Sequence, residues 1–292
     1  MMNAWTKRRG GHAALWTAVW LLLTVFAQAS GGTLTLHYAF DGVPFAVYRV
    51  AEKSGADYVL TAPFDDCKVR LPSEKDGASR WRDAAETLAG CAAGEHAAAQ
   101  ETVQDGQAAF TGLADGLYLV VGGRHTQDGA ACLPVVFLAE VSGGKSAGAD
   151  VKWDSGDPDG SIGGVTVTVR KLWQDDDPRE RPENVELRLL CDGTPYEDVR
   201  LEEANGWQYS WHGLDAACRW QVVEPDVPEG YTVSVSREGW NFTVTNTADA
   251  PREPVWPGGL LPQTGQLWWP AAVLAVLGVL LIWADRRAGR RK

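Results

Sequence analysis

The alternation of apolar and polar residues between positions 165 and 174 restricts the fold of this chain more than any other feature. Side chains of a β-strand point alternately to its two faces, so this segment has one apolar face and one polar face. The apolar face carries Val165, Val167, Val169, Lys171 and Trp173. Further short, β-branched stretches follow, separated by turn sequences such as Asn205-Gly206 and Pro228-Glu229-Gly230. Short strands at this spacing predict a β-sandwich over residues 164–248.

Three polar residues fall on the apolar faces of strands in this region. Lys171 is one of them. Asn246 continues the face of Trp240, Phe242 and Val244, and Glu224 continues the face of Trp220 and Val222. Because an unpaired charge in an apolar core is strongly unfavourable, we expect the side chains of Lys171, Glu224 and Asn246 to meet.

Such a meeting predicts a covalent bond between the first and last strands. An apolar environment lowers the pKa of a lysine and raises that of a glutamate, which gives a neutral amine and a neutral carboxylic acid. The Lys171 amine is then a nucleophile, Glu224 relays protons, and the Asn246 side-chain amide supplies the carbonyl. Attack with loss of ammonia would form an isopeptide bond. The alternatives are a buried Lys171–Glu224 ion pair with Asn246 as a bystander, or a solvent-exposed strand end.

The same segment resembles a Cna B-type domain along most of its length. The resemblance implies an isopeptide bond between Lys171 and Asn246 with Glu224 as the assisting acid, which are the residues that strand parity selects. Cys191 and Cys218 depart from the family pattern. The resemblance rests on these sequences: Val167-Thr168-Val169-Arg170-Lys171-Leu172-Trp173, Val185-Glu186-Leu187-Arg188-Leu189, Asn205-Gly206-Trp207, Val222-Val223-Glu224, Pro228-Glu229-Gly230-Tyr231 and Phe242-Thr243-Val244-Thr245-Asn246-Thr247.

Residues 30–154 are predicted to be mostly strands, with one helical insertion. Alternating or apolar runs favour strands at 33–38, 45–50, 116–121 and 133–141. Residues 80–99 favour a helix, because Trp81, Ala84, Ala85 and Leu88 recur at helical spacing after Ser79, a candidate N-cap. The stretch 142–164 is rich in Gly, Ser and Asp and favours irregular structure, so the linker between domains is placed at 155–163.

Residues 30–154 also resemble the N-terminal domain of Gram-positive pilins. The similarity is carried by Asp41-Gly42-Val43-Pro44-Phe45 and Gly116-Leu117-Tyr118-Leu119-Val120. Major pilins of that family carry a lysine that sortase joins to the next subunit; the nearest candidate in this chain is Lys152, which lacks the surrounding motif. The resemblance therefore favours a minor pilin or a single wall-anchored protein. This region also lacks an isopeptide set, since His37 and Tyr38 stand where the lysine is expected and Val121-Gly122-Gly123 where the acid is expected.

The two ends of the chain predict export and anchoring. Residues 1–29 have a basic start, an apolar run and small residues at Ala27 and Ala29, which is typical of a cleaved signal peptide; the alternative is a membrane anchor. Residues 249–260 are rich in Pro and Gly and predict a wall-spanning linker. Residues 267–284 form an uncharged apolar run long enough to span a bilayer, and a basic tail follows.

Residues 261–292 resemble an LPXTG cell-wall sorting signal, with Leu261-Pro262-Gln263-Thr264-Gly265 before the apolar run and basic tail. The resemblance implies that a sortase cleaves between Thr264 and Gly265 and transfers Thr264 to an amine. The acceptor is a peptidoglycan precursor or a pilin subunit, and the C-terminal helix holds the precursor in the membrane before sorting. A chance pentapeptide before an ordinary membrane anchor is the alternative.

Composition excludes some partners. The chain has a net charge of −11; cleavage at both ends would remove eight basic residues and one acidic residue, leaving 19 against 37 and a charge of −18. Such a surface argues against nucleic-acid binding. The five cysteines show no metal-ligand spacing, so neither a metal nor another cofactor is expected. Cys191 and Cys218 could form a disulfide, and Cys67, Cys91 and Cys132 could supply another in some pair.

These observations predict an all-β protein of two tandem, Ig-like β-sandwich domains, with terminal signal and transmembrane helices. The favoured function is a secreted, wall-anchored, pilin-like structural protein with an intramolecular isopeptide bond. An adhesin that binds a host protein or glycan through residues 30–154 is the alternative. A hydrolase would require a catalytic cluster, and neither the recognised catalytic motifs nor the five histidines indicate one.

Overall fold

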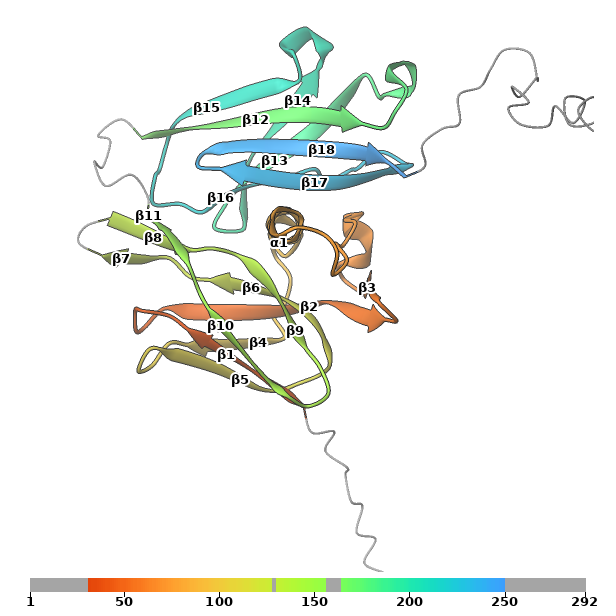
Figure 1. Ribbon diagram of the computed structural model, residues 1–292. Helices are drawn as coiled ribbons and strands as arrows, with labels where there is room; N and C mark the ends of the chain where they lie inside the picture. The colour runs from red at the N-terminus through yellow and green to blue at the C-terminus, as the bar shows by residue number, and fades with distance from the viewer. Residues whose placement is uncertain (1–30, 128–129, 156–163, 250–292) are drawn as a thin grey trace, which may run out of the picture.

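The computed structural model describes residues 31–127, 130–155 and 164–249. Within them the protein is mostly β, with several sheets and one α-helix (Figure 1). We call residues 31–155 the N-terminal part and residues 164–249 the C-terminal part. The predicted signal peptide, nearly all of the linker and the whole sorting signal lie outside the described residues. Among the described residues, no helix combines the length and the apolar character that crossing a membrane requires.

The N-terminal part contains three sheets. Their strand orders are β10-β1-β5, β3-β2-β6-β9 with β4 also paired to β2, and β11-β8-β7. Leu34, Leu36, Phe45 and Phe110 form the centre of a core between the first two sheets. The elements are β1 (Gly32–His37), β2 (Pro44–Ser54), β3 (Asp57–Leu60), the 3₁₀ helix η1 (Asp65–Cys67), α1 (Ala78–Cys91), β4 (Ala99–Thr102), β5 (Gln107–Leu113), β6 (Gly116–Gly122), β7 (His125–Gln127), β8 (Ala130–Pro134), β9 (Phe137–Val141), β10 (Ser146–Asp150) and β11 (Trp153–Ser155).

The C-terminal part contains a four-stranded sheet, β15-β12-β18-β17, and a three-stranded sheet, β14-β13-β16. Val167, Val169, Leu187 and Leu189 from the two sheets are fully buried. The elements are β12 (Val165–Gln174), η2 (Pro178–Glu180), β13 (Asn184–Cys191), β14 (Thr194–Glu202), η3 (Glu203–Asn205), β15 (Gln208–Leu214), β16 (Trp220–Val223), β17 (Tyr231–Glu238) and β18 (Asn241–Ala248).

Strand parity is confirmed in this part. Burial alternates along β12, with Val165, Val167, Val169 and Lys171 buried and the residues between them more exposed. It alternates in the same way along β18. Strand β16 differs, because Gln221 on its second face is buried too. That second face is covered by the N-terminal part of the chain, which parity within one strand does not reveal.

Two sequence predictions in the N-terminal part are wrong. The helix ends at Cys91 rather than near residue 99, and its N-cap is Gly77, which offers no side-chain cap, rather than Ser79. The alanines that follow the helix enter a turn, and Ala99 starts β4. The stretch 142–155 is not irregular throughout, because it contains β10 and β11. Strand β10 pairs with β1 through its backbone, and the small side chains of β10 allow this pairing.

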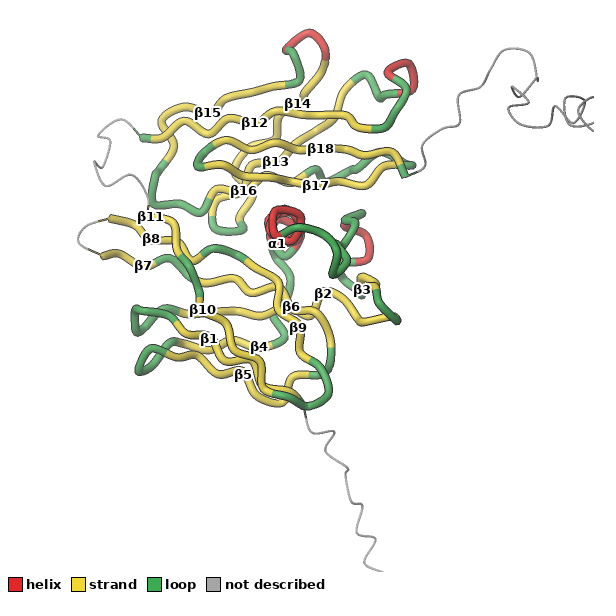
Figure 2. The backbone as a smooth tube through the Cα atoms, viewed as in Figure 1, coloured by secondary structure: helices red, strands yellow, loops and turns green. Residues whose placement is uncertain are grey.

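Helix α1 lies between the two parts (Figures 1 and 2). Its Ala85 and Leu88 belong to one continuous core together with Val222 and Val235 of the C-terminal part. Gly90 permits the close approach, since a Cβ there would lie 3.3 Å from the Cβ of Val223. The two parts therefore share a hydrophobic core rather than touching only at their surfaces.

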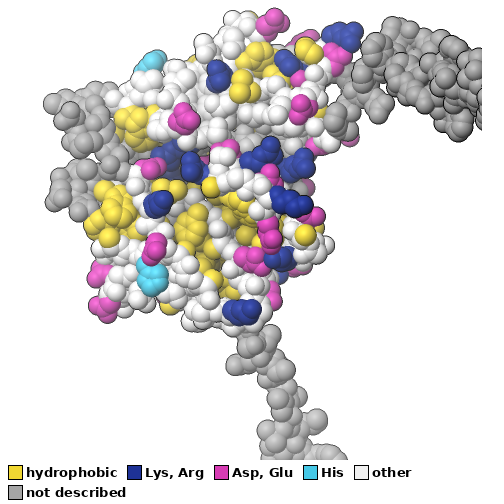
Figure 3. Space-filling model, viewed as in Figure 1, with side chains coloured by type: hydrophobic (Ala, Val, Ile, Leu, Met, Phe, Trp, Pro, Cys, Tyr) yellow, Lys and Arg dark blue, Asp and Glu magenta, His cyan; other side chains and the backbone are white. Residues whose placement is uncertain are grey.

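Polar contacts reinforce this shared core. The backbone N–H of Val235 donates to the Thr87 hydroxyl at 2.8 Å. The buried Arg219 guanidinium donates to the carbonyls of Gly122 and Pro134, both at 2.9 Å. Charged side chains gather along this seam on the face shown in Figure 3, and Arg237 pairs with Asp154 across it at 3.2 Å. The seam is thus fixed by directional contacts as well as by apolar packing.

Candidate functional site

Lys171 lies in the middle of the sandwich because β12 is a central strand. On one side β12 pairs antiparallel with β15, and on the other it pairs parallel with β18. In the parallel register Lys171 faces Val244, and Asn246 lies two residues further on, opposite Trp173. Lys171 and Asn246 are 2% and 0% exposed, so both polar side chains are enclosed by the apolar core.

Glu224 reaches Lys171 and Asn246 from the opposite sheet. It follows β16 directly and is buried. Its Oε2 accepts a hydrogen bond from Lys171 Nζ at 2.6 Å, and its Oε1 accepts one from Asn246 Nδ2 at 3.0 Å. The structure therefore brings together the three residues that strand parity selected, with one carboxyl group contacting both the amine and the amide.

The environment changes the chemistry of the amine. Burial lowers the pKa of Lys171 to about 8, although the neighbouring Glu224 acts in the opposite direction. The amine therefore loses its proton far more easily than an exposed lysine does. The Asn246 Oδ1 atom is buried and has no hydrogen-bond partner among the described residues. An easily deprotonated amine and an amide held by the same buried carboxyl group are suited to nucleophilic attack of the amine on the amide.

Aromatic side chains enclose the amine. The Trp173 ring lies 5.0 Å from Lys171 Nζ, a cation–π distance. Trp207 and Tyr231 pack edge-on against Trp173, with ring centroids 5.4 and 5.3 Å from it. This enclosure keeps water from the Lys171 amine. Sequence reasoning missed Trp207 and Tyr231, because both lie next to turns where strand parity assigns no face.

A polar contact closes the outer side of this aromatic group. Arg181 forms two hydrogen bonds of 2.7 Å to the Asp176 carboxylate, and Tyr231 donates a third at 3.2 Å. The Arg181 hydrogen bond holds the pKa of Asp176 below its usual range. Asp176 and Arg181 thereby fix the loop after β12 against Tyr231.

Cys191 and Cys218 form a disulfide with their Cα atoms 5.6 Å apart. The bond joins the end of β13 to the residues before β16. Cys191, Asp192 and Cys218 are also the one group of potential metal ligands found among the described residues, but its two sulfur atoms are already bonded to each other.

At the position in the N-terminal part that corresponds to Lys171, the side chain is a tyrosine, Tyr38. Strand β1 lies between β10 and β5 as β12 lies between β18 and β15. Along the core face, Leu34 and Leu36 precede Tyr38, as Val167 and Val169 precede Lys171. The Tyr38 hydroxyl lies 3.3 Å from His125 Nδ1, and Trp153 packs edge-on against Tyr38 at 5.8 Å. Burial raises the pKa of Tyr38 to about 12, so the phenol stays neutral.

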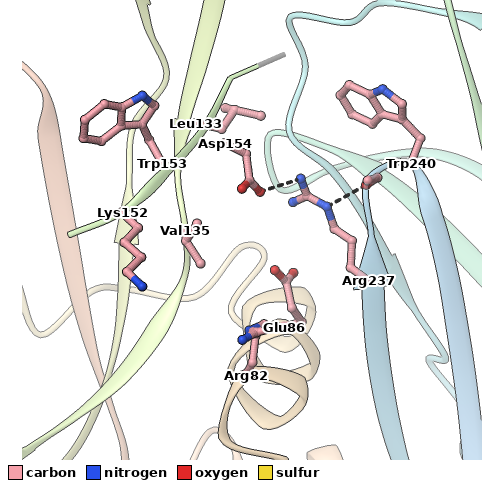
Figure 4. A pocket seen from close by; sticks show the side chains of 10 residues that line it. Arg82, Glu86, Leu133, Val135, Lys152, Trp153, Asp154, Arg237 and Trp240 are labelled. Atoms are coloured by element: carbon pink, nitrogen blue, oxygen red, sulfur yellow. Dashed lines mark hydrogen bonds and ion pairs between the residues drawn. The ribbon is translucent and has the colours of Figure 1, made fainter. Parts of the chain in front are cut away.

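A pocket of about 590 Å³ opens on the seam between the two parts (Figure 4). Arg82 and Glu86 enter it from α1, Lys152 and Trp153 lie on the side of β11, and Arg237 comes from β17. Burial raises the pKa of Glu86. Asp154 and Trp240 also contribute to the lining, and Trp153 is 41% exposed. The pocket combines charges of both signs, while the Trp153 indole points away from its centre (Figure 4) and packs against Tyr38 and Phe40.

Comparison with known proteins identifies the C-terminal part. Residues 167–247 match the Cna protein B-type domain, so the chain carries a domain of this family. The chain is also 33% identical over 106 residues to a collagen adhesin of Staphylococcus aureus, an alignment that covers 32% of this chain. It spans only 9% of the length of that relative.

Similar solved structures include one B repeat of the collagen-binding surface protein of Staphylococcus aureus. That match has 15% identity and a TM-score of 0.29, and covers 75% of this chain and 98% of the repeat. A minor pilin of Streptococcus agalactiae matches with 17% identity and a TM-score of 0.22, covering 77% of this chain and all of the pilin chain.

Proposed function

We propose that this chain is an exported, wall-anchored structural protein whose Cna B-type domain carries an isopeptide bond between Lys171 and Asn246. The observation that supports the proposal is the contact of one buried carboxyl group, Glu224, with both the amine and the amide. A surface protein benefits from such a bond because it ties the first strand of the domain to the last.

The contacts suit each step of the reaction. Lys171 Nζ attacks the side-chain carbonyl carbon of Asn246, and the amine proton passes to Glu224 Oε2. The leaving nitrogen is already hydrogen-bonded to Glu224 Oε1, so the same carboxyl group returns a proton to it. The C–N bond to Nδ2 breaks as the bond to Nζ forms, and ammonia leaves. Glu224 begins and ends the reaction in the same protonation state.

Intact mass measurement tests the bond. After reduction of its disulfides, the protein is expected to be lighter than its sequence by about 17 Da, the mass of one ammonia. Lys171→Ala, Glu224→Ala and Asn246→Ala should each show the full sequence mass. Asn241→Ala is the matched control, because Asn241 lies on the same strand with an exposed side chain and should leave the mass loss unchanged. A wild-type protein with full sequence mass contradicts the proposal.

The anchoring part of the proposal rests on Leu261-Pro262-Gln263-Thr264-Gly265 and its sequence context. The partners are a sortase and an amine of the peptidoglycan precursor or of a pilin subunit. A Thr264→Ala variant should stay in the membrane fraction while the wild type is released only by wall digestion. A ladder of high-molecular-weight species in wall digests would indicate polymerisation, and Lys152→Ala would show whether its amine is the acceptor.

We propose ligand binding as a second function, supported by the pocket at the seam. Its cationic residues Arg82, Lys152 and Arg237 suit a sugar or peptide that carries acidic groups. Binding of the exported chain to glycan and matrix-protein arrays tests this adhesin function. Arg82→Ala should reduce a genuine signal, whereas Arg170→Ala, at an exposed arginine outside the pocket, should not.

A further inference from the structure

Cys67 and Cys91 end two elements that lie beside each other. Cys67 is the last residue of η1, and Cys91 is the last residue of α1. Both side chains are half-buried and pack against the core shared by the two parts. The chain between them includes Val69, which bridges to Val233 of β17, and then forms α1.

The two sulfur atoms are in contact. A side-chain hydrogen bond between the two thiols, followed by burial, raises the pKa of Cys91. The two residues also line one hollow of about 440 Å³, together with Gly90 and with Val223 and Val233 of the C-terminal part. The thiols thus face each other at the seam, where a bond between them would act on both parts.

We infer that Cys67 and Cys91 form a second disulfide, which fastens residues 67–71 to α1 and so fixes the seam. The inference rests on the proposed export, because disulfides persist outside the cytoplasm and not within it. The sequence alone allows a disulfide between any two of Cys67, Cys91 and Cys132, and the structure favours the pair Cys67–Cys91.

The segment that this disulfide would fasten already contacts the C-terminal part. The Lys68 carbonyl accepts a hydrogen bond from the backbone N–H of Val233 at 2.9 Å, and Val69 forms an isolated parallel bridge with Val233. Lys68 Nζ donates to the carbonyl of Val227 at 2.8 Å. Lys68 has a φ of 50°, a left-handed conformation that is unfavourable for a residue with a side chain. A cross-link at the preceding residue would hold this conformation in place.

The third cysteine belongs to a different neighbourhood. Cys132 lies in β8, opposite His125 of β7 on one side and Ser155 of β11 on the other. It is buried among these strands, whereas Cys67 and Cys91 line a hollow to which Cys132 does not contribute. Pairing Cys132 with Cys67 or Cys91 would therefore require β8 to leave its sheet.

The oxidation is a thiol–disulfide exchange with a dithiol–disulfide oxidoreductase, or with oxidised glutathione in the test tube. One of the two cysteines attacks the oxidant as its thiolate and forms a mixed disulfide with it, and one sulfur of the oxidant leaves as a thiol. The thiolate of the other cysteine then attacks the mixed disulfide and displaces the second sulfur of the oxidant. The Cys67–Cys91 bond forms, and its two electrons reduce the oxidant from a disulfide to two thiols.

The test begins with the purified full chain incubated with oxidised glutathione, then denatured and treated with iodoacetamide without reduction. Trypsin should release peptides 54–68 and 83–124 as one linked species, lighter by about 2 Da than the sum of the two. Cys67→Ser and Cys91→Ser should each abolish this species, and Cys132→Ser should preserve it. Iodoacetamide on both Cys67 and Cys91, or a linkage of either residue to Cys132, overturns the inference.

Thermal unfolding under non-reducing conditions shows whether the bond stabilises the fold. The oxidised wild type should melt roughly 5–10 °C above the Cys67→Ser/Cys91→Ser double variant, and the Cys132→Ser control should show a smaller change. Equal melting temperatures of the oxidised wild type and the double variant would show that the disulfide does not stabilise the seam. Export is tested separately, by looking for the protein in the cell-wall fraction. Its absence there would contradict the proposed function but would not change the result with oxidised glutathione.

Discussion

The two parts of the protein place a parallel pair of strands at the same position and secure it with different side chains. In the C-terminal part β12 lies beside β18, and Lys171, Glu224 and Asn246 meet at the end of the pair. In the N-terminal part β1 lies beside β10, and Tyr38 packs against His125 and Trp153 there. The same strand arrangement therefore occurs with and without the Lys–Glu–Asn group. The presence of this group depends on the side chains at a few positions.

The aromatic group around Tyr38 and the polar group of Lys171, Glu224 and Asn246 stabilise the fold in different ways. Edge-on contacts link Tyr38 to Phe40, Phe45 and Trp153 at centroid distances between 5.3 and 5.8 Å. Such contacts contribute through packed area and need no proton transfer. Lys171 and Glu224 are unfavourable to bury unless each satisfies the other, so the C-terminal site depends on every one of its members. Substitutions should therefore have larger effects in the C-terminal part.

Removal of Glu224 should give the largest effect. Both Glu224→Ala and Asn246→Ala should prevent the bond, which closes a loop of 75 residues and on loop entropy is worth roughly 4 kcal/mol. Glu224→Ala should lose about 3 kcal/mol more, because it leaves the Lys171 amine buried without a partner. Urea unfolding of both variants measures the difference. Equal stability of the two would contradict the account of the buried amine.

Tyr38→Lys tests whether a lysine alone makes the N-terminal part behave like the C-terminal part. The new amine would face His125 rather than a carboxyl group, so it should form no bond and should reduce the free energy of unfolding by about 3 kcal/mol. Tyr38→Phe is the control, with an expected loss below about 1 kcal/mol. A mass loss of about 17 Da in Tyr38→Lys would show that a lysine at this position is sufficient and that the bond needs no neighbouring carboxyl group.

The seam between the two parts should contribute less than either site. Thr87→Val removes the acceptor for the buried N–H of Val235 at nearly constant volume, and should cost about 2 kcal/mol. Thr87→Ser keeps the hydroxyl and should cost less. Fluorescence and circular dichroism should follow one unfolding transition in the wild type, because α1 lies in the core that the two parts share. Two transitions in the wild type would mean that the shared core does not couple the parts.

The smallest expected effect is the pH dependence of stability in a variant that cannot form the Lys171–Asn246 bond. In an Asn246→Ala background the folded pKa of Lys171 lies near 8, below the ordinary value of 10.5, so the unfolded chain binds more protons between these values. Stability should therefore rise with pH across this window, by about 1 kcal/mol per pH unit at most. The Lys171→Met/Asn246→Ala variant removes the titrating group and should lack this rise. A rise of the same size in both variants would assign it to other groups.

Periodicity alone predicted the C-terminal site well. Alternation along three strands placed Lys171, Asn246 and Glu224 on core faces, and the high free energy of an unpaired buried charge then required the three side chains to meet. The aromatic enclosure was not predicted, because Trp207 adopts a positive φ at a turn and Tyr231 begins a strand, so neither has a face that alternation can assign.

The N-terminal part was predicted less well for physical reasons that can be named. Strand β10 is built from Ser146, Ala147, Gly148, Ala149 and Asp150, and its pairing depends on backbone hydrogen bonds to β1 rather than on apolar side chains. Composition therefore indicated a loop. The contact of α1 with β16 and β17 was also out of reach, since periodicity identifies an apolar face and not the surface that covers it.

The parallel pairing of β12 with β18 also determines how the domain would respond to tension. The chain enters at Val165, the start of β12, and leaves at Ala248, the end of β18, so a pull on both ends slides the two strands along each other. The ladder of hydrogen bonds is then loaded in shear and must break nearly together, instead of opening one bond after another. The pair β1 and β10 has the same polarity. Resistance to pulling is therefore present in the topology of both parts before any covalent bond adds to it.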